Sequence, residues 1–236
     1  MEHKLKITQK EWLTHDVMRF TLEKPEGFEY TAGQAVEVTL DDPKFEDDWS
    51  PFTLTSLNKD DHLEFTIKCY PDHKGTTLAL SKLEKGDHFI ATDPWDSFKN
   101  KGAGVFIAGG TGVTPFIALL RQMQEDGEVN GSTLIFSNKR EEDIFLSDEF
   151  TRILGKNFIN VITQEKVEPY FHGRIDKAFL KNVVQNFDQP FYLCGPDNFA
   201  DDIKVHLKEL GAADNLVNVS LYNQIPSGFV IKKTSP

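Results

Sequence analysis

The sequence changes its pattern near residue 100, and this change limits the possible folds more than any other feature. Before it, short segments rich in β-branched and aromatic residues alternate with turn-forming sequences such as Pro25-Glu26-Gly27. The segments are residues 5–8, 17–22, 35–40, 52–56, 63–68 and 88–91. Several alternate apolar and polar residues, which is typical of strands with one buried face. We therefore expect a six-stranded antiparallel β-barrel, interrupted by one short helix over about residues 77–83.

After residue 100, continuous apolar runs alternate with helical patterns. The runs are residues 104–108, 133–136, 158–162, 191–194 and 217–221. Such runs are typical of strands buried on both faces of a parallel sheet, with helices as the crossover connections. The first helix is expected to begin at Pro115 with Thr114 as its N-cap, and the last to end at Gly211. The chain is thus predicted to have two domains, an antiparallel barrel over residues 1–99 and a parallel-sheet α/β domain over residues 100–236.

The net charge argues against a nucleic-acid partner. The 236 residues include 26 Lys and Arg against 37 Asp and Glu, so the formal net charge is −11. Binding to a phosphate backbone depends on an excess of Lys and Arg, which this chain lacks. The acidic residues are concentrated in the first 99 residues, whose net charge is −8 against −3 for the rest.

No pattern typical of export or of a membrane span is present. The charged start Met1-Glu2-His3-Lys4 is followed by no apolar core, and the longest uncharged stretch, residues 102–120, contains five glycines and a proline. We therefore expect a cytoplasmic protein without a membrane span. Cys69 and Cys194 are too few for an iron–sulfur cluster, and no metal site is predicted. Any redox chemistry must then use an organic cofactor.

The most informative motif is a glycine-rich turn between an apolar strand and a helix. It is Ala108-Gly109-Gly110-Thr111-Gly112-Val113-Thr114-Pro115. Glycines allow a ligand to approach the backbone, and the N–H groups at a helix start suit a pyrophosphate. The spacing differs from the usual G-x-G-x-x-G fingerprint, so the motif alone also fits a tight turn without a ligand.

Three further segments contain residues suited to a cofactor. They are Ser50-Pro51-Phe52-Thr53, Gly75-Thr76-Thr77 and Tyr192-Leu193-Cys194-Gly195-Pro196. The first offers an aromatic surface with hydroxyls, the second a possible phosphate site at a helix start, and the third a thiol at the end of a buried strand. Taken singly, each has a plainer explanation: a core aromatic, a helix cap and an inert buried cysteine.

The four segments, in this order, resemble the motifs of the ferredoxin–NADP reductase superfamily of flavoproteins, and the resemblance extends from about His3 to Tyr222. It implies a flavin-binding barrel followed by a nicotinamide dinucleotide domain, with hydride passing from the nicotinamide to FAD, which it favours over FMN. Thr53 and Cys194 would be the catalytic residues, with Thr53 near flavin N5 and Cys194 beside the nicotinamide. The residues implied to bind the flavin are Ser50, Pro51, Phe52, Thr53, Lys68, Gly75, Thr76 and Thr77. Those implied to bind the dinucleotide are Gly110, Thr111, Gly112, Thr114, Pro115, Ser137, Lys139, Arg140, Cys194, Gly195 and Pro196.

This chain departs from the family pattern at three positions. Ser50 stands where the family commonly has an Arg that binds a flavin phosphate, so Lys68 or Lys74 would have to supply the positive charge. Phe52 replaces the usual Tyr and keeps the stacking face. Ser220-Leu221-Tyr222 lacks the acid that many members carry, which suits one-electron delivery or a proton relay through Cys194 or water.

The preference between NADPH and NADH stays open. Ser137, Lys139 and Arg140 follow the second strand of the α/β domain, where the family meets the adenosine ribose, and two cations suit a 2′-phosphate. The next residues, Glu141-Glu142-Asp143, resemble NADH-using members equally well. A solvated charged loop is the plainer alternative.

These observations predict an NAD(P)H-dependent flavoprotein oxidoreductase that passes electrons through FAD to a separate acceptor, a flavodoxin or ferredoxin. Because the flavin half carries net charge −8, we expect the acceptor to dock through a local basic or apolar patch. Two alternatives remain: a flavin reductase that releases free reduced flavin, and a degenerate regulatory protein that binds dinucleotides without turnover.

Overall fold

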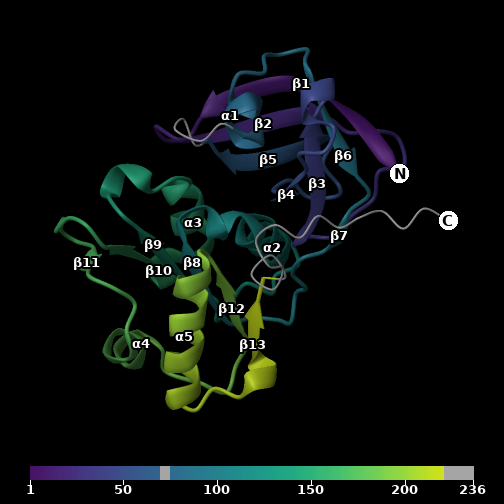
Figure 1. The fold of residues 1–236 in the computed structure, drawn as a ribbon. Coiled ribbons are helices and arrows are strands. Elements are labelled where there is room, and N and C mark those ends of the chain that lie inside the picture. The colour runs from purple at the N-terminus through teal and green to yellow at the C-terminus, as the bar shows by residue number, and fades with distance from the viewer. Residues whose placement is uncertain (70–74, 221–236) are drawn as a thin grey trace.

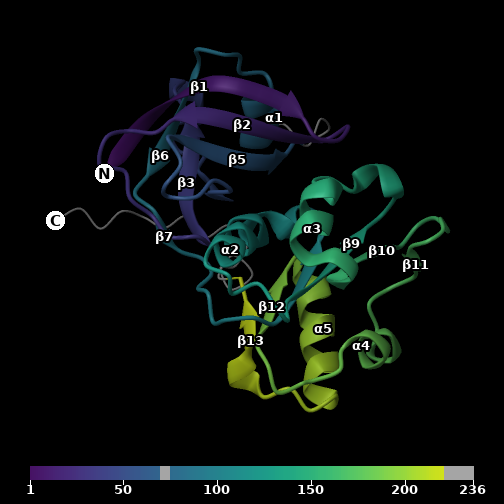
Figure 2. The same cartoon turned by 180° about the vertical axis from the view of Figure 1, so that it is seen from behind.

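The computed structural model describes residues 1–69 and 75–220. Its two sheets form two bodies that lie one above the other, and helix α2 (Thr114–Glu125) lies between them (Figures 1 and 2). Residues 70–74 and 221–236, which include Lys74 and Tyr222 of the sequence predictions, lie outside the described residues.

The first sheet is an antiparallel, nearly closed barrel. Its strands are β1 (Glu2–Trp12), β2 (Val17–Glu23), β3 (Gln34–Leu40), β4 (Ser50–Thr53), β5 (His62–Lys68), β6 (His88–Thr92) and the short β7 (Trp95–Asp96). The order is β4-β3-β6-β1-β2-β5, with β7 paired to β3, and a bridge between Leu54 and Phe65 joins β4 to β5 at the open edge. The predicted antiparallel barrel is confirmed: six strands follow this order, β4 begins two residues earlier than expected, and the short β7 was not predicted.

The barrel encloses an aromatic and aliphatic core. Phe20 and Phe89 meet edge to face at 5.0 Å between ring centroids. Helix α1 (Thr76–Ser81), shorter than predicted, packs Leu80 into the same core.

The second sheet is parallel, as predicted. Its strands are β8 (Val105–Gly109), β9 (Thr133–Asn138), β10 (Phe158–Ile162), β11 (Phe171–His172), β12 (Phe191–Cys194) and β13 (Val217–Val219), in the order β11-β10-β9-β8-β12-β13. The sequence does not predict β11, because its two residues are exposed and form no apolar run.

Helices cover both faces of the parallel sheet. The other helices of this half are α3 (Ser147–Leu154), α4 (Lys177–Val183) and α5 (Asp197–Glu209). Along β8, Phe106 packs with α2 and α3, whereas Val105 and Ile107 pack with α4 and α5, because successive side chains of a strand point to opposite faces. The short 3-10 helices are η1 (Pro43–Phe45), η2 (Gly110–Val113), η3 (Glu141–Asp143), η4 (Gly155–Asn157) and η5 (Asp214–Leu216).

The start of α2 differs from the expectation. The glycine-rich turn forms η2, which runs directly into α2, so Val113 is the N-cap and Thr114 is the first helical residue. The prediction of Thr114 as the N-cap is therefore wrong, because η2 leaves no extended residue before the helix. The Thr114 hydroxyl instead donates to the Thr111 carbonyl at 3.0 Å.

The two bodies share an apolar contact. Val17, at the start of β2, is buried in the core that α2 forms against the parallel sheet, and Phe98 packs edge to face on Phe116 at 5.3 Å. The division between domains at residues 99 and 100 stays a prediction. Within the described ranges, no helix is long and apolar enough to cross a bilayer.

Candidate active site

A cavity of about 1130 Å³ lies where the barrel meets the carboxyl ends of the parallel strands. Open α/β sheets bind ligands at this edge. Both bodies contribute to the lining: β4, β5, α1 and the β1–β2 turn from the barrel, and the glycine-rich turn with the ends of β9 and β12 from the second sheet. One ligand in this cavity would contact both halves of the chain.

Most of the residues predicted for the site line this one cavity. They are Pro51, Phe52, Thr53, Lys68, Thr77, Gly110, Thr111, Gly112, Thr114, Pro115, Ser137, Lys139, Arg140, Cys194, Gly195 and Pro196. Three predicted residues, Ser50, Gly75 and Thr76, are not part of its lining. The Thr76 hydroxyl donates instead to the Asp48 carbonyl at 3.2 Å.

The glycine-rich turn lies against the end of β12. A Cβ at Gly112 would stand 2.3 Å from the Cys194 carbonyl oxygen, so only glycine fits there. At Gly110 (φ +53°), a Cβ would meet nothing within 4 Å, so the turn is open on that side. Close packing against β12 therefore requires glycine at position 112, whereas Gly110 has open space beside it.

Cys194 is a buried thiol at the end of β12. It is 8% exposed, and burial raises its pKa to about 12 although a hydrogen bond with Ser220 acts in the opposite direction. A thiol with such a pKa stays protonated at neutral pH. The structure thus places Ser220, the position of the missing acid, beside the predicted catalytic cysteine.

Lys68 is close to an acid. Its ammonium lies 2.6 Å from the Asp16 carboxylate, which partly neutralises the charge that the sequence suggested for a flavin phosphate.

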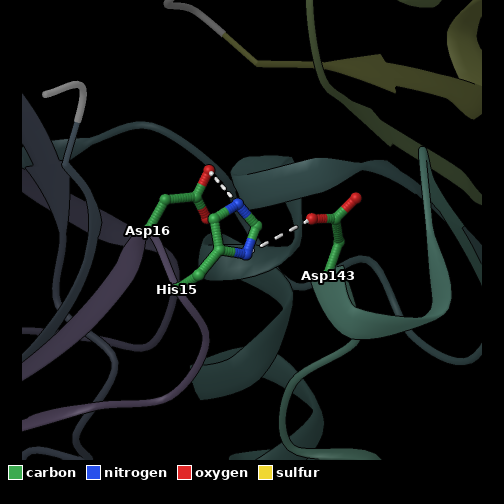
Figure 3. A group of neighbouring side chains, drawn as sticks. All are labelled: His15, Asp16 and Asp143. Atoms are coloured by element: carbon green, nitrogen blue, oxygen red, sulfur yellow. Dashed lines mark ion pairs between the residues drawn. The ribbon is translucent and has the colours of Figure 1, made fainter. Parts of the chain in front are cut away.

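His15 from the β1–β2 turn lies between Asp16 at 3.5 Å and Asp143 of η3 at 3.9 Å (Figure 3). All of these side chains line the cavity, and the His15–Asp143 contact joins the two bodies there.

The loop after β9 carries charges of both signs. Arg140 lies 3.4 Å from Glu142, and its backbone N–H donates to Asp143 at 2.9 Å. Lys139 and Arg140 are both exposed. One of the two cations that would suit a 2′-phosphate is thus paired with an acid of its own loop, and the preference between NADPH and NADH stays open.

The sequence did not indicate two cavity-lining side chains with unsatisfied polar atoms. Thr66 Oγ1 on β5 and Asn138 Nδ2 at the end of β9 are buried and have no hydrogen-bond partner among the described residues. Buried polar groups usually have one. Thr66 lies two residues from Lys68 on the same face of β5, and this alternation is the signal that could have found it.

Two family models match the chain. The model described as "FAD-binding domain" matches residues 2–94, and the one described as "Oxidoreductase NAD-binding domain" matches residues 106–205. The chain therefore belongs to the oxidoreductases that join an FAD-binding domain to an NAD-binding domain. The first match lies in the barrel half and the second in the half with the parallel sheet.

The curated reductases that resemble the chain are longer than the matched region. The reductase component of propane 2-monooxygenase from Rhodococcus jostii (strain RHA1) is 29% identical over 213 residues, which cover 83% of this chain and 57% of that protein. NADH-cytochrome b5 reductase 2 from Mycosarcoma maydis is 29% identical over 205 residues, which cover 77% and 58%. The chain thus spans less than two thirds of the length of these relatives.

Solved structures of flavoprotein reductases share the fold. A ferredoxin NADP+ reductase from Neisseria gonorrhoeae with bound FAD and NADP superposes with a TM-score of 0.80 at 19% identity, covering 93% of this chain and 98% of that one. This likeness confirms the predicted two-domain fold.

The cavity fits the two groups that a flavoprotein reductase of this kind binds. The half-buried ring of Phe52 offers an apolar face on the barrel side, and Thr66 has an unsatisfied hydroxyl there. On the other side, Gly110 leaves open space and the unsatisfied amide of Asn138 lies in the lining. Each half of the cavity is thus lined by a residue whose buried polar atom has no partner among the described residues.

Proposed function

We propose that the protein is an NAD(P)H-dependent flavoprotein oxidoreductase that passes electrons from a nicotinamide through FAD to a separate acceptor. The observation that carries this proposal is the single cavity lined by both matched domains. A hydride moves only over a short distance between stacked rings, so donor and flavin must meet in one space. The cavity offers that space.

On the barrel side, we assign the flavin ring to Phe52 and Thr53. The Phe52 ring is half-buried, and Thr53 is 4% exposed at the same end of β4. Pro51 continues this surface, and Ser50 begins the strand. The family resemblance implies that Gly75, Thr76 and Thr77 bind the phosphates, and we keep this assignment for Thr77 with the charge of Lys68, because Gly75 and Thr76 lie outside the lining. Thr77 and Lys68 support this assignment by lining the cavity.

On the other side, we assign the dinucleotide to the glycine-rich turn and the residues around it. Gly110, Thr111 and Gly112 with the start of α2 would face the pyrophosphate, since N–H groups at a helix start favour anions. The adenosine end is assigned to Ser137, Lys139 and Arg140, and the nicotinamide to Cys194, Gly195 and Pro196. All of these residues line the cavity.

FAD held by Phe52, Thr53 and the other barrel residues would supply the redox chemistry, since a flavin can take up a hydride and pass electrons on to an acceptor. The residues of this chain would contribute positioning and the exclusion of water. Thr53 would donate a hydrogen bond at the reacting edge of the ring. The Cys194 thiol, with its pKa raised by burial to about 12, would pack beside the nicotinamide without carrying charge.

The absorption spectrum tests this proposal. We expect the protein with FAD to retain a band near ~450 nm that NADPH or NADH bleaches without oxygen. Bleaching by one donor only would also assign the preference that the loop after β9 leaves open. A retained band that neither donor bleaches would contradict oxidoreductase activity and support the regulatory alternative.

For the acceptor, we propose a small electron-transfer protein, a flavodoxin or ferredoxin. Among the similar proteins are the reductase component of propane 2-monooxygenase and the electron transfer component of an anthranilate 1,2-dioxygenase. With an acidic carrier and a flavin half of net charge −8, the reduction rate should not rise steeply as salt falls from about 300 to about 20 mM. A steep rise at low salt would reveal strong complementary charge and contradict docking through a low-charge patch.

A second candidate is a flavin reductase that releases reduced flavin. Ser50 provides no cation for a flavin phosphate, and the ammonium of Lys68 is paired with Asp16 at 2.6 Å. Both features weaken binding of the flavin phosphates. Reduced flavin that passes through a filter retaining the protein would favour this candidate, whereas retained flavin would favour the electron-transfer reductase.

A further inference from the structure

Arg121 is a charged residue of α2 that lies between the two bodies. Its side chain is 19% exposed. One guanidinium nitrogen, Nη1, donates to the Thr55 carbonyl at 2.7 Å and to Glu64 Oε1 at 2.8 Å, both in the barrel half. The other nitrogens, Nε and Nη2, donate to the two oxygens of Glu149 on α3 at 2.6 and 3.0 Å. The side chain of Arg121 thus forms hydrogen bonds with both halves of the chain.

The acids around Arg121 form a connected network. The Thr55 hydroxyl donates to Glu64 Oε1 at 2.8 Å, and Arg19 lies 3.8 Å from the other oxygen of Glu64. Burial alone raises the pKa of Glu149, but Arg121 outweighs it and holds that pKa below its ordinary value. Glu149 therefore stays ionised at neutral pH and fixes one edge of the guanidinium.

The residues that Arg121 contacts are near cavity-lining residues in the sequence, both in the barrel half and in the half with the parallel sheet. Thr55 is two residues from Thr53, and Glu64 is two residues from Thr66 on β5. Arg121 itself belongs to the helix that begins directly after the glycine-rich turn. Arg121 therefore connects the barrel segment next to Thr53 with the helix that follows the glycine-rich turn.

Stability alone does not explain a charged residue here. Taking an ion pair out of water costs about as much as the attraction returns, so apolar residues of similar size often stabilise such a place equally well. A guanidinium differs because its flat fork fixes the direction of several hydrogen bonds at once. The planar guanidinium of Arg121 can therefore hold the two bodies at a fixed distance from each other.

We propose that Arg121 is a positioning residue that sets the spacing between the two walls of the cavity, and so the alignment of nicotinamide and flavin rings. The proposal rests on the oxidoreductase function proposed above. It assigns to Arg121 no contact with either ligand; the residue acts through Thr55, Glu64 and Glu149.

The test compares Arg121→Met with a matched control, Lys59→Met. Lys59 also pairs across the two bodies, with Glu125 of the same helix, but its side chain is exposed. We expect Arg121→Met to slow flavin bleaching at saturating NAD(P)H by about 10- to 100-fold, since small misalignments of reacting groups cost that much. The control should keep the wild-type rate, and both variants should keep the FAD dissociation constant within about 2-fold, because neither residue contacts the flavin site.

A second variant covers the case that Arg121→Met does not fold. Arg121→Lys keeps the charge beside the acids but loses the fork, and we expect it to fold and still slow bleaching about 3- to 10-fold at saturating donor. Both Arg121 variants should also weaken the long-wavelength absorbance that stacked nicotinamide and flavin rings produce, which lost stability alone would not change.

The outcomes separate the two proposals. Wild-type rates and wild-type long-wavelength absorbance in the Arg121 variants would overturn the positioning role. If the wild-type flavin is bleached by neither donor, the oxidoreductase proposal itself fails, whatever the variants do.

Discussion

At the scale of single residues, the site depends on a few side chains whose chemistry follows from burial. Thr53 and Cys194 were predicted from motifs, and both line the cavity. Thr66 and Asn138 were not predicted, because a Thr in a strand or an Asn after one is common without a ligand. Only the packing around them shows that their polar atoms lack partners within the described ranges.

Replacement of Thr53 tests its role at the reacting edge. We expect Thr53→Ala to slow flavin reduction by roughly 10²-fold, the scale of a lost preorganised hydrogen bond. Thr53→Ser, which keeps the hydroxyl, is the matched control and should stay close to wild type. Stopped-flow bleaching of the flavin by NAD(P)H measures both. Equal rates in all three proteins would remove Thr53 from the mechanism.

The two thiols should be unreactive in the folded protein. Burial raises the pKa of Cys194 to about 12 and that of Cys69 to about 11, from an ordinary 9.0. At pH 8 the reactive thiolate is then a very small fraction of either residue. We expect iodoacetamide to modify neither in the native protein and both after unfolding in urea. Fast native modification would show that the thiols are ionised.

The raised pKa values of the two thiols also determine how the stability of the fold depends on pH. Because these pKa values are higher in the folded than in the unfolded chain, the contribution of the protonated thiols to the free energy of unfolding is fully present below about pH 9. It is lost as the pH rises through the folded pKa values. The free energy of unfolding in urea should therefore fall between pH 9 and pH 11. The fall should be smaller in Cys69→Ala, which removes one of the two thiols.

At the scale of secondary structure, the glycine-rich turn is the element with the clearest reason for its sequence. The motif predicted a strand, a tight turn and a helix, and β8, η2 and α2 confirm this succession. The N-cap was misplaced because a 3-10 helix and an α-helix share their turn chemistry at this point. The need for glycine at 112 became visible only with β12 in place beside the turn.

A substitution in this turn should separate dinucleotide binding from flavin binding. In Gly112→Ala, the new Cβ would stand 2.3 Å from the Cys194 carbonyl oxygen, so the turn must move away from β12. We expect NAD(P)H to bind at least about 10-fold more weakly while FAD binding stays unchanged, since the displaced turn loses its aligned N–H groups. Titration of each ligand measures this.

The control for this substitution lies at the other end of α2. Gly127 has φ +73°, a backbone conformation that Asn tolerates, and a Cβ added there would meet nothing within 4 Å. Gly127→Asn should therefore leave NAD(P)H affinity at the wild-type value. Loss of affinity in both variants would point to a general weakening of α2 and against a specific role of the turn.

At the scale of the whole molecule, the two bodies should unfold together. Val17 is buried in the core of the second body, and Arg121 binds groups of both. Because these contacts are lost when either body unfolds, unfolding of one destabilises the other. The two family domains are therefore coupled by packing as well as by the proposed ligands.

Two spectroscopic signals can test this coupling. Trp12, Trp49 and Trp95 all lie in the first 99 residues, so tryptophan fluorescence reports on the barrel. The longer helices α2 to α5 all lie in the second half, so far-ultraviolet circular dichroism reports chiefly on that half. We expect both signals to change at the same urea concentration in wild type, and two separate midpoints would show that the bodies unfold independently.

The sequence by itself determined the class of each half, the order of the two domains and the four motifs of the site. These features depend on local periods, turn residues and spacings, which residues near one another in the chain encode. Phe52, Thr53 and the glycine-rich turn could be identified in this way.

Only the tertiary structure decided which distant groups meet. Arg121 lies 57 residues from Glu64 along the chain, and Lys68 is paired with Asp16 across neighbouring strands. Such pairs depend on how whole elements pack, and a charged side chain looks the same in the sequence whether it faces water, an acid or a ligand. For this reason the cavity could be expected from the motifs, whereas the network that joins its two walls could not.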